Sequence, residues 1–206
     1  YTISANWLRP DQTYYWKAIA ITATGTVESG LGTFVYAPPK LEQPAWVPFY
    51  RAFNSNVVDH FYCSSESHLL QAMDGNYSFE GVEGYVSLHP FMLTSPDTLK
   101  PIYRFYIPNE EVPKRSCHYY TTSDSDRDNR IIQGWIYEGI TGYGFNQPKE
   151  GLTKLYHTWL NVPGNRMDNF YTISEIEKNN SISLFGYTDQ GFITYVSATG
   201  DNATMP

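Results

Sequence analysis

The sequence is poor in charged residues and has no surplus of basic ones. Asp, Glu, Lys and Arg make up 17% of the 206 residues, the formal net charge is −7 and the pI is ≈ 5.1. Soluble domains usually hold about a quarter of such residues. Proteins that bind a phosphate backbone gather Lys and Arg for that purpose. This composition therefore excludes nucleic acid as a partner.

Long hydrophobic runs and cysteines are also scarce. No stretch approaches the roughly 18 consecutive apolar residues of a membrane-spanning helix, so we expect no membrane span. The two cysteines, Cys63 and Cys117, are too few for a disulfide framework. A single bridge between them is a candidate that the sequence leaves open.

Motifs of catalysis and metal binding are missing too. The chain has no Gly-x-Ser-x-Gly, His-Glu-x-x-His or Cys-x-x-Cys, and its five histidines are scattered. The acidic stretch DSDRDN, residues 124–129, lacks the glycine and the closing glutamate of a calcium loop. We therefore predict a protein that is not an enzyme and holds no cofactor and no metal ion.

Aromatic residues are what the sequence has in abundance. Tyr, Phe and Trp make up 17% of the chain, with 18 Tyr among them, and 15 Gly and 13 Pro are spread between them. Aromatic and β-branched residues favour strands, while Gly and Pro mark the turns that separate strands. The composition rules out a disordered chain and predicts an all-β fold of many short strands.

The first 37 residues differ in pattern from the rest. Side chains alternate along residues 14–20, and a turn is expected at Thr24-Gly25 before a second strand. The spacing of Leu8, Pro10 and Tyr14 resembles the end of a fibronectin type III module, in which such a tyrosine ties down a corner. Because the resemblance covers only about a third of a module, we expect the rest of the sandwich to be missing from this chain. The alternatives are that these strands pack on the following domain or that they form an ordinary N-terminal hairpin.

A proline-rich segment follows these strands. Residues 36–48, YAPPKLEQPAWVP, carry four prolines, which fix φ and donate no backbone hydrogen bond. We read residues 38–46 as a stiff linker to a second domain, residues 47–206. The chain starts at Tyr1 with neither an initiator Met nor a signal peptide, which suggests a fragment or a processed product.

A pattern of about 53 residues recurs three times in the second domain. Tyr50, Tyr103 and Tyr156 open it in VPFYRAFN, KPIYRFYI and TKLYHTWL. The phrases DHFYCSS, CHYYTTS and DNFYTIS follow, and an element such as YSFEGVEGYVS or WIYEGITGYGF closes each copy. We place the three repeats at residues 47–99, 100–152 and 153–197.

These repeats predict a β-trefoil. Helical solenoids are excluded because no stretch keeps a helical period beyond about ten residues; residues 64–73 come nearest, with a turn or two. Each copy offers about four short strands, which cannot bury an apolar face alone. A propeller typically needs four or more blades, so three four-stranded units that close one barrel are the better interpretation.

The copies resemble a trefoil repeat of unknown function that is appended to secreted hydrolases and surface proteins. The phrases DHFYCSS and IYEGITGY carry the resemblance, which covers residues 45–197. It is weaker in the third copy, where Asn169 replaces His60 and His118, and where Thr188-Asp189 stands in place of Glu-Gly. Through its likeness to trefoil lectins, the family implies carbohydrate binding by a lectin-like module.

The resemblance directs attention to polar side chains beside aromatic rings, because sugars bind to such combinations. The candidate ligand-binding residues are Asp59, His60, Glu80 and Tyr85 in the first copy, His118, Glu138 and Tyr143 in the second, and Asp168, Asn169, Asp189 and Trp159 in the third. Trp46 and Trp135 are further candidate rings. Because Cys117 replaces the carboxylate of Asp59, we expect the first and third sites to be the more competent.

The same residues also have a structural interpretation. Tyr62 and its counterparts in the other two copies are predicted core residues. Beside them, His60 and His118 are expected to bond backbone carbonyls, and Glu80 and Glu138 to accept from turn N–H groups. Under this interpretation the repeated phrase serves the fold and not a ligand.

We predict a secreted or cell-surface glycoprotein module whose partners are glycans. The sequons at Asn76, Asn179 and Asn202 are candidate glycosylation sites. The alternative is a structural or adhesive assembly module of an extracellular matrix or filament, which contacts neighbouring protein chains. Under this alternative, those neighbours include further copies of the same chain, in a homo-oligomer. Exposed aromatic patches away from the repeats favour assembly; rings beside unpaired carboxylates favour sugar.

Overall fold

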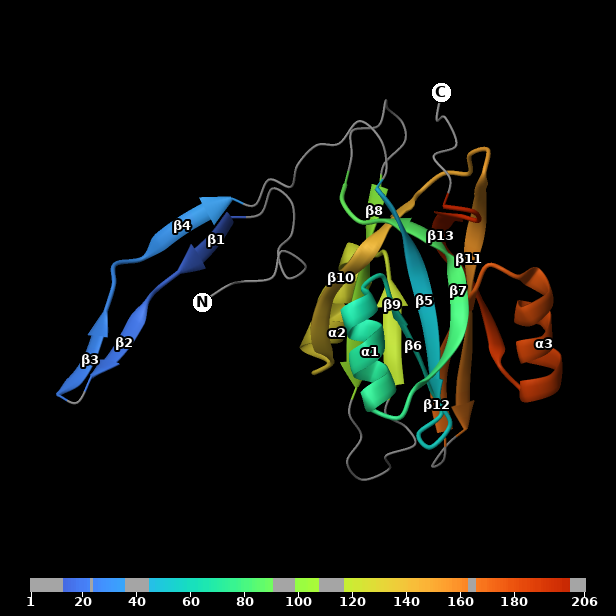
Figure 1. Ribbon diagram of the computed structural model, residues 1–206, viewed down its shortest axis with the longest axis horizontal. Helices are drawn as coiled ribbons and strands as arrows, with labels where there is room; N and C mark the ends of the chain where they lie inside the picture. The colour runs from blue at the N-terminus through green and yellow to red at the C-terminus, as the bar shows by residue number, and fades with distance from the viewer. Residues whose placement is uncertain are drawn as a thin grey trace. The chain divides into compact units, whose positions relative to one another are not determined.

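The computed structural model describes residues 13–22, 24–35, 45–90, 99–107, 117–162 and 166–200. The chain divides into two units, Tyr1–Pro39 and Lys40–Pro206 (Figure 1), and the division falls within the predicted linker. The described part is mostly β-sheet with three short helices, as the composition predicts. None of these helices is long and apolar enough to cross a membrane. Leu8, Pro10, Asn202 and most of the linker lie outside the described residues.

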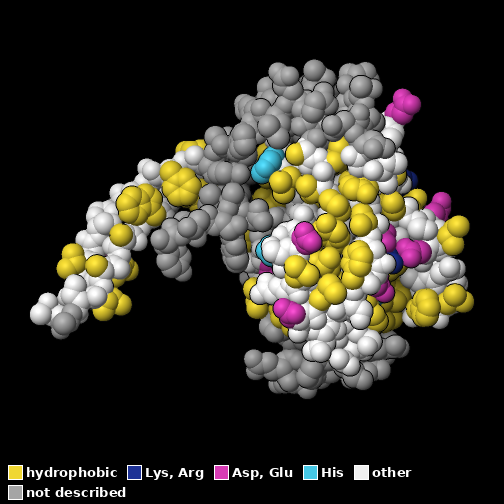
Figure 2. All heavy atoms as spheres, viewed as in Figure 1, with side chains coloured by type: hydrophobic (Ala, Val, Ile, Leu, Met, Phe, Trp, Pro, Cys, Tyr) yellow, Lys and Arg dark blue, Asp and Glu magenta, His cyan; other side chains and the backbone are white. Residues whose placement is uncertain are grey.

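The first unit is a long β-hairpin. Its strands are β1 (Thr13–Trp16), β2 (Ile19–Thr22), β3 (Gly25–Glu28) and β4 (Gly32–Val35), with β1 paired to β4 and β2 paired to β3. Tyr14 stacks on Phe34 with ring centroids 5.5 Å apart. Apolar side chains stand out along the hairpin (Figure 2), Ile21 being 86% exposed. A two-stranded ribbon has no second layer that could bury them.

The second unit contains three copies of one strand–strand–helix–strand unit. The first copy consists of β5 (Trp46–Asn54), β6 (Asp59–Cys63), α1 (Glu66–Asp74) and β7 (Ser78–Ser87). The second consists of β8 (Leu99–Ile107), β9 (Cys117–Thr121), α2 (Asp124–Ile132) and β10 (Ile136–Phe145). The third consists of β11 (Leu152–Val162), β12 (Arg166–Thr172), α3 (Glu175–Phe185) and β13 (Thr188–Ser197). Each copy begins one residue before its predicted start.

A helix in each copy replaces one of the four strands that the sequence predicts. Residues 64–73, which come nearest to a helical period, overlap with α1, whereas α2 and α3 escape a search for apolar periodicity because each buries a single polar side chain, Arg127 and Ser181. Their signal lies in the caps. The hydroxyls of Ser123 and Ser174 each accept the backbone N–H three residues later, at 3.2 Å, which is the usual N-cap of a helix.

In each copy the long first strand lies in the middle and pairs antiparallel with the other two. The last strands, β7, β10 and β13, also pair with one another through single contacts, so the three copies meet around a common axis. The helices lie on the outside of the strands (Figure 1).

A ring of three tyrosines forms the centre of the second unit. The hydroxyl of Tyr62 donates to the carbonyl of Tyr171 at 2.7 Å and accepts its N–H at 2.8 Å. Tyr120 binds Tyr62 in the same way, and Tyr171 binds Tyr120, with distances of 2.7 to 3.0 Å. Burial raises the pKa of all three hydroxyls well above the ordinary value. The prediction that these tyrosines are core residues is confirmed.

Candidate functional site

The strand phrase that begins at Asp59 faces two neighbouring copies at once. Successive side chains alternate along β6, so Asp59 and Phe61 contact the second copy while His60 and Tyr62 contact the third. Asp59 accepts the backbone N–H of His118 at 2.8 Å, and its other oxygen lies 2.6 Å from the Nδ1 atom of that residue. The phrase therefore joins each copy to both others.

Three equivalent sites result, one at each junction between copies. Site 1 consists of Arg51, His60 and Glu80 of the first copy with Asp168 and Phe170 of the third. Site 2 consists of Arg104, His118 and Glu138 of the second copy with Asp59 and Phe61 of the first. Site 3 consists, at the same registers, of His157, Asn169 and Gln190 of the third copy with Cys117 and Tyr119 of the second.

His60 in site 1 is held by a buried carboxylate. The Asp168 oxygens accept the His60 backbone N–H at 2.8 Å and lie 2.6 Å from its Nδ1, and the Tyr187 hydroxyl donates to the same group at 2.5 Å. Burial lowers the pKa of His60, but Asp168 outweighs burial and the pKa is raised. Burial raises the pKa of Asp168, but the charge of His60 outweighs it and the pKa is lowered. The raised pKa favours the imidazolium form of His60 beside this carboxylate, and the expected bond from His60 to a backbone carbonyl is wrong.

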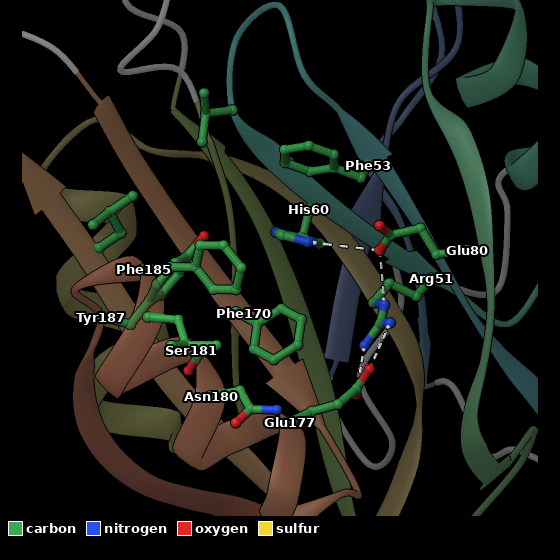
Figure 3. Close-up of a pocket in the computed structure, with 13 residues that line it drawn as sticks. Arg51, Phe53, His60, Glu80, Phe170, Glu177, Asn180, Ser181, Phe185 and Tyr187 are labelled. Atoms are coloured by element: carbon green, nitrogen blue, oxygen red, sulfur yellow. Dashed lines mark hydrogen bonds and ion pairs between the residues drawn. The ribbon is translucent and has the colours of Figure 1, made fainter.

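Arg51 binds three carboxylates in site 1, and Figure 3 shows two of them, Glu80 and Glu177. Its Nε lies 2.8 Å from Glu80, and its Nη1 lies 2.7 Å from Glu83. Glu177, in the first turn of α3, accepts from Nη1 and Nη2 at 3.1 and 3.3 Å. Burial raises the pKa of Glu177, but hydrogen bonds from Arg51 and Thr172 outweigh burial and the pKa is lowered. Glu177 therefore stays ionised beside the guanidinium.

A glycine bulge brings Glu80 to this guanidinium. Gly81 pairs with Arg51 and has a φ of 151°, and the β5–β7 register shifts by one residue just beyond this pair. Gly139 and Gly191 occupy the same place in the other copies with φ of 104° and 84°. Such a positive φ favours glycine, and a bulge re-aims the neighbouring side chain.

A cavity of ≈ 610 Å³ opens at site 1, between the first copy and α3 of the third (Figure 3). Its polar lining includes Arg51, His60, Glu80, Glu177 and Asn180, and its apolar lining includes Phe53, Phe170, Leu184 and Phe185. The Phe170 ring lies 5.1 Å from the Arg51 guanidinium carbon and 5.0 Å from the His60 ring. Cavities of roughly 300–1,000 Å³ with this mixture of linings are typical of small-molecule sites.

Site 2 repeats the central geometry of site 1. His118 Nδ1 lies 2.6 Å from Asp59, to which the Tyr77 hydroxyl also donates at 2.5 Å. Arg104 Nε lies 3.0 Å from Glu138, and the guanidinium carbon lies 4.9 Å from the Phe61 ring. The two sites thus share one arrangement of arginine, glutamate, histidine and buried aspartate.

Site 3 is neutral. Cys117 stands where the other junctions have an aspartate, and Asn169 stands in place of the histidine; the Asn169 amide donates to the His118 carbonyl at 2.9 Å. His157 replaces the arginine and lies 3.0 Å from the Asn169 side-chain oxygen. Burial lowers the pKa of His157 to about 4, so this histidine is uncharged at neutral pH. Trp135 takes the place of the tyrosine that binds the aspartate elsewhere.

The cysteines do not form the bridge that the sequence left open. Cys63 and Cys117 are both buried free thiols. Burial raises the pKa of Cys63 to about 11 and raises that of Cys117 well above the ordinary value. Within the described ranges, no group of three or more His, Cys, Asp or Glu side chains is arranged to hold a metal ion.

The structure groups the predicted residues differently from the sequence. His60, Glu80, His118, Glu138 and Asn169 lie in the junction sites, but each site draws on two copies. Asp59 belongs with His118 and not with His60, and Asp168 belongs with His60. Both aspartates are fully buried, so they orient a histidine and cannot face a ligand directly.

The predicted rings and the third acidic residue lie elsewhere. Tyr85 and Tyr143 are farther along their strands, paired with Pro48 and Pro101. Trp46 packs on Phe145, with ring centroids 5.9 Å apart. Trp159 occupies the register of Phe53 at site 3, opposite Asn169. Asp189 pairs with Thr158, which makes Gln190 the counterpart of Glu80. Asn76 and Asn179 are exposed.

The sequence reasoning missed the residues that organise the sites. Arg51 and Arg104 follow the repeated tyrosine in the first two copies, and this Tyr-Arg pair was the available signal. Glu177 had a signal too, because it stands three residues after a serine at a helix start, the pattern of a capping box.

Comparison with known proteins places the chain in a family. No curated protein and no solved structure matches it. A family model described as Domain of unknown function (DUF5648) matches residues 30–112 and 48–197. The second of these matches spans all three strand–strand–helix–strand copies and the three junction sites between them. The chain therefore belongs to the DUF5648 family.

Proposed function

We propose that this chain binds carbohydrate without catalysis, at site 1, as a module of a secreted or cell-surface protein. The observation that carries the proposal is the cavity in which a row of ordered polar groups, Glu80, Arg51 and Glu177, runs beside the Phe170 and Phe185 rings. Sugars present pairs of hydroxyls to planar polar groups and an apolar C–H face to a ring.

The polar side of the cavity is ordered before any ligand arrives. Arg51 is fixed by two ion pairs to residues that line the cavity, and His60 is fixed by Asp168 beneath it. Groups that are already in place lose little conformational entropy on binding. Phe185 is 66% exposed at the rim and supplies a ring that a sugar can cover.

The same contacts argue against glycoside hydrolysis. A glycosidase needs one carboxyl group whose pKa is raised so that it can protonate the leaving oxygen. Of the two carboxylates in the cavity, Glu177 has a lowered pKa, and Glu80 is paired with Arg51. Both groups suit the accepting of sugar hydroxyls better than the donation of a proton.

The trefoil-lectin and fibronectin type III identities are part of this proposal. Three equivalent junctions around one axis support a relationship to trefoil lectins, in which each repeat offers a pocket. The exposed apolar side chains of the N-terminal hairpin support the interpretation that it is the end of a sandwich.

The test is a glycan array probed with the full 206-residue chain, made in bacteria so that Asn179 carries no glycan. Asn180→Ala and Phe185→Ala remove groups that line the cavity without touching the buried aspartates. Asn129→Ala is the matched control, because Asn129 is the α2 counterpart of Asn180 and is also exposed. Binding that falls at least tenfold in both cavity variants and survives in the control supports the proposal; equal binding in all four proteins refutes it.

A second candidate function is assembly with neighbouring protein chains. The observation that favours it is the exposure of Ile176 and Leu184 on α3, 74% and 70%, in addition to Phe185. Apolar groups exposed in this way mark contact surfaces between proteins. An array without any binding, together with concentration-dependent association in sedimentation that Ile176→Ser abolishes, would establish this candidate instead.

A further inference from the structure

Site 2 contains a buried arginine that lacks the partners of its counterpart in site 1. Arg104 is 8% exposed, and its Nη1 has no hydrogen-bond partner among the described residues. The equivalent nitrogen of Arg51 lies 2.7 Å from Glu83 and 3.1 Å from Glu177. Leaving a buried charged donor without a partner costs more than the usual hydrogen bond contributes.

Arg104 lacks these partners because two positions that hold glutamates around Arg51 hold other residues around Arg104. Thr141 on β10 occupies the place of Glu83 on β7, and His68 on α1 occupies the place of Glu177 on α3. Neither side chain supplies a carboxylate. Glu138 is the one carboxylate that pairs with Arg104 within the described ranges, through Nε. At site 1 the carboxylate of Glu177 thus pairs with Arg51, while at site 2 the imidazole of His68 stands at the same position beside Arg104.

We propose that site 2 binds the carboxylate group of an acidic sugar, a uronic acid, which pairs with Arg104 as Glu177 pairs with Arg51. That the ligand is a sugar rests on the proposed function. That it carries a carboxylate is inferred from the unpartnered Nη1 atom of Arg104 alone. Arginine suits a carboxylate because its fork of N–H groups matches two oxygens.

His68 is the residue that a ligand displaces. Its imidazole is half-buried and makes no hydrogen bond in the part of the chain that the structure describes. Burial lowers the pKa of His68 and the charge of Arg104 lowers it further, so the imidazole is neutral and lies near the guanidinium. A neutral side chain without partners moves aside at little cost, whereas Glu177 in site 1 is held by Arg51 and Thr172.

The experiment is calorimetric titration of the full chain with sodium D-glucuronate, D-glucose and sodium acetate. His68→Glu places at site 2 the carboxylate that pairs with the arginine at site 1, and His68→Gln is its matched, uncharged control. We expect glucuronate to bind the parent and the control, and glucose to bind neither at site 2. We expect His68→Glu to weaken glucuronate binding at least tenfold while its thermal midpoint stays at or above that of His68→Gln.

Two results overturn the inference: glucuronate binding no tighter than glucose, or equal glucuronate binding by the His68→Glu and His68→Gln variants. If acetate binds as tightly as glucuronate, the inference that site 2 recognises a sugar is refuted, and site 2 is a site for simple carboxylate anions. Failure here is distinguishable from failure of the proposed function, because Asn180→Ala acts on site 1 and leaves Arg104 and His68 intact.

Discussion

Sites 1 and 3 have the same geometry but different chemistry. At both junctions, the second strand of one copy places a side chain against a side chain on the second strand of another copy, in the buried interior. Site 1 uses the charged pair His60 and Asp168, with a tyrosine donating to the carboxylate. Site 3 uses Asn169 and Cys117, both uncharged, with Trp135 in the place of the tyrosine.

The comparison teaches that the members of each junction depend on one another. A buried carboxylate needs every donor that surrounds it, because an unpaired charge in the interior is costly. When the aspartate is absent, the histidine and the tyrosine donor lose their role together, and all three positions differ at site 3. The tyrosine ring at the axis is kept at all three junctions.

The largest effect is expected from removing the carboxylate of site 1. Asp168→Ala leaves the His60 imidazolium buried without its partner and should lower the free energy of unfolding by about 3–5 kcal/mol. Cys117→Ala, the same position at site 3, removes only a weak contact and should cost about 1 kcal/mol. Urea unfolding followed by tyrosine fluorescence measures both. Equal losses would contradict the difference between the two junctions.

The histidines of the two sites should respond to pH in opposite directions. The pKa of His157 is about 4 in the folded protein, below its unfolded value, so its contribution is complete above pH 6.5 and is lost as the pH falls. Between pH 7 and pH 4 the parent should lose about 3 kcal/mol more stability than His157→Gln.

The contribution of His60 to stability should depend on pH in the opposite direction. Its pKa is raised in the folded protein, so its contribution is complete below pH 6.5 and disappears as the pH rises through the folded value. The stability difference between the parent and His60→Gln should therefore be larger at pH 5.5 than at pH 9. The same sign of slope for both histidines would show that site 1 and site 3 do not differ in charge.

The tyrosine ring should behave alike at every junction. Tyr120→Phe removes one hydroxyl and leaves the N–H and the carbonyl of Tyr62 without that partner. Two buried backbone groups that each lose a hydrogen bond should cost about 2 kcal/mol in all. Tyr62→Phe and Tyr171→Phe should cost the same within about 0.5 kcal/mol. A cost confined to one of the three would mean that the copies are not equivalent at the axis.

The order of the repeats could be predicted from the sequence because it depends on local patterns. Tyrosines at fixed intervals and alternating strand residues marked the three copies and the core position of Tyr62. Residues 64–73, the best helical candidate of the sequence, overlap with α1, whereas α2 and α3 were missed because they bury only Arg127 and Ser181 and so lack the apolar stripe by which helices are found.

The candidate sites could be predicted only in part. His60 and Glu80 were found because they stand in repeated phrases, but their partners come from another copy, and nothing local in a sequence states which copies adjoin. Asp168 lies 108 positions from His60 along the chain. The third glutamate position was placed two residues too early, at Thr188, although an ungapped alignment of YTDQGF with YSFEGV puts Gln190 there, as the strand register does.

The smallest net change is expected when the chemistry of site 1 is rebuilt at site 3. Cys117→Asp alone buries an unpaired carboxylate and should cost about 3–5 kcal/mol. Adding Asn169→His supplies the imidazolium, and adding Trp135→Tyr supplies the hydroxyl that the other aspartates accept. The triple variant should return to within about 1 kcal/mol of the parent, because contacting residues are coupled by about 0.5–3 kcal/mol. Unfolding of the single, double and triple variants measures this coupling. If the three costs simply add, the members of a junction are independent, and the shared absence of all three at site 3 has no physical cause in this network.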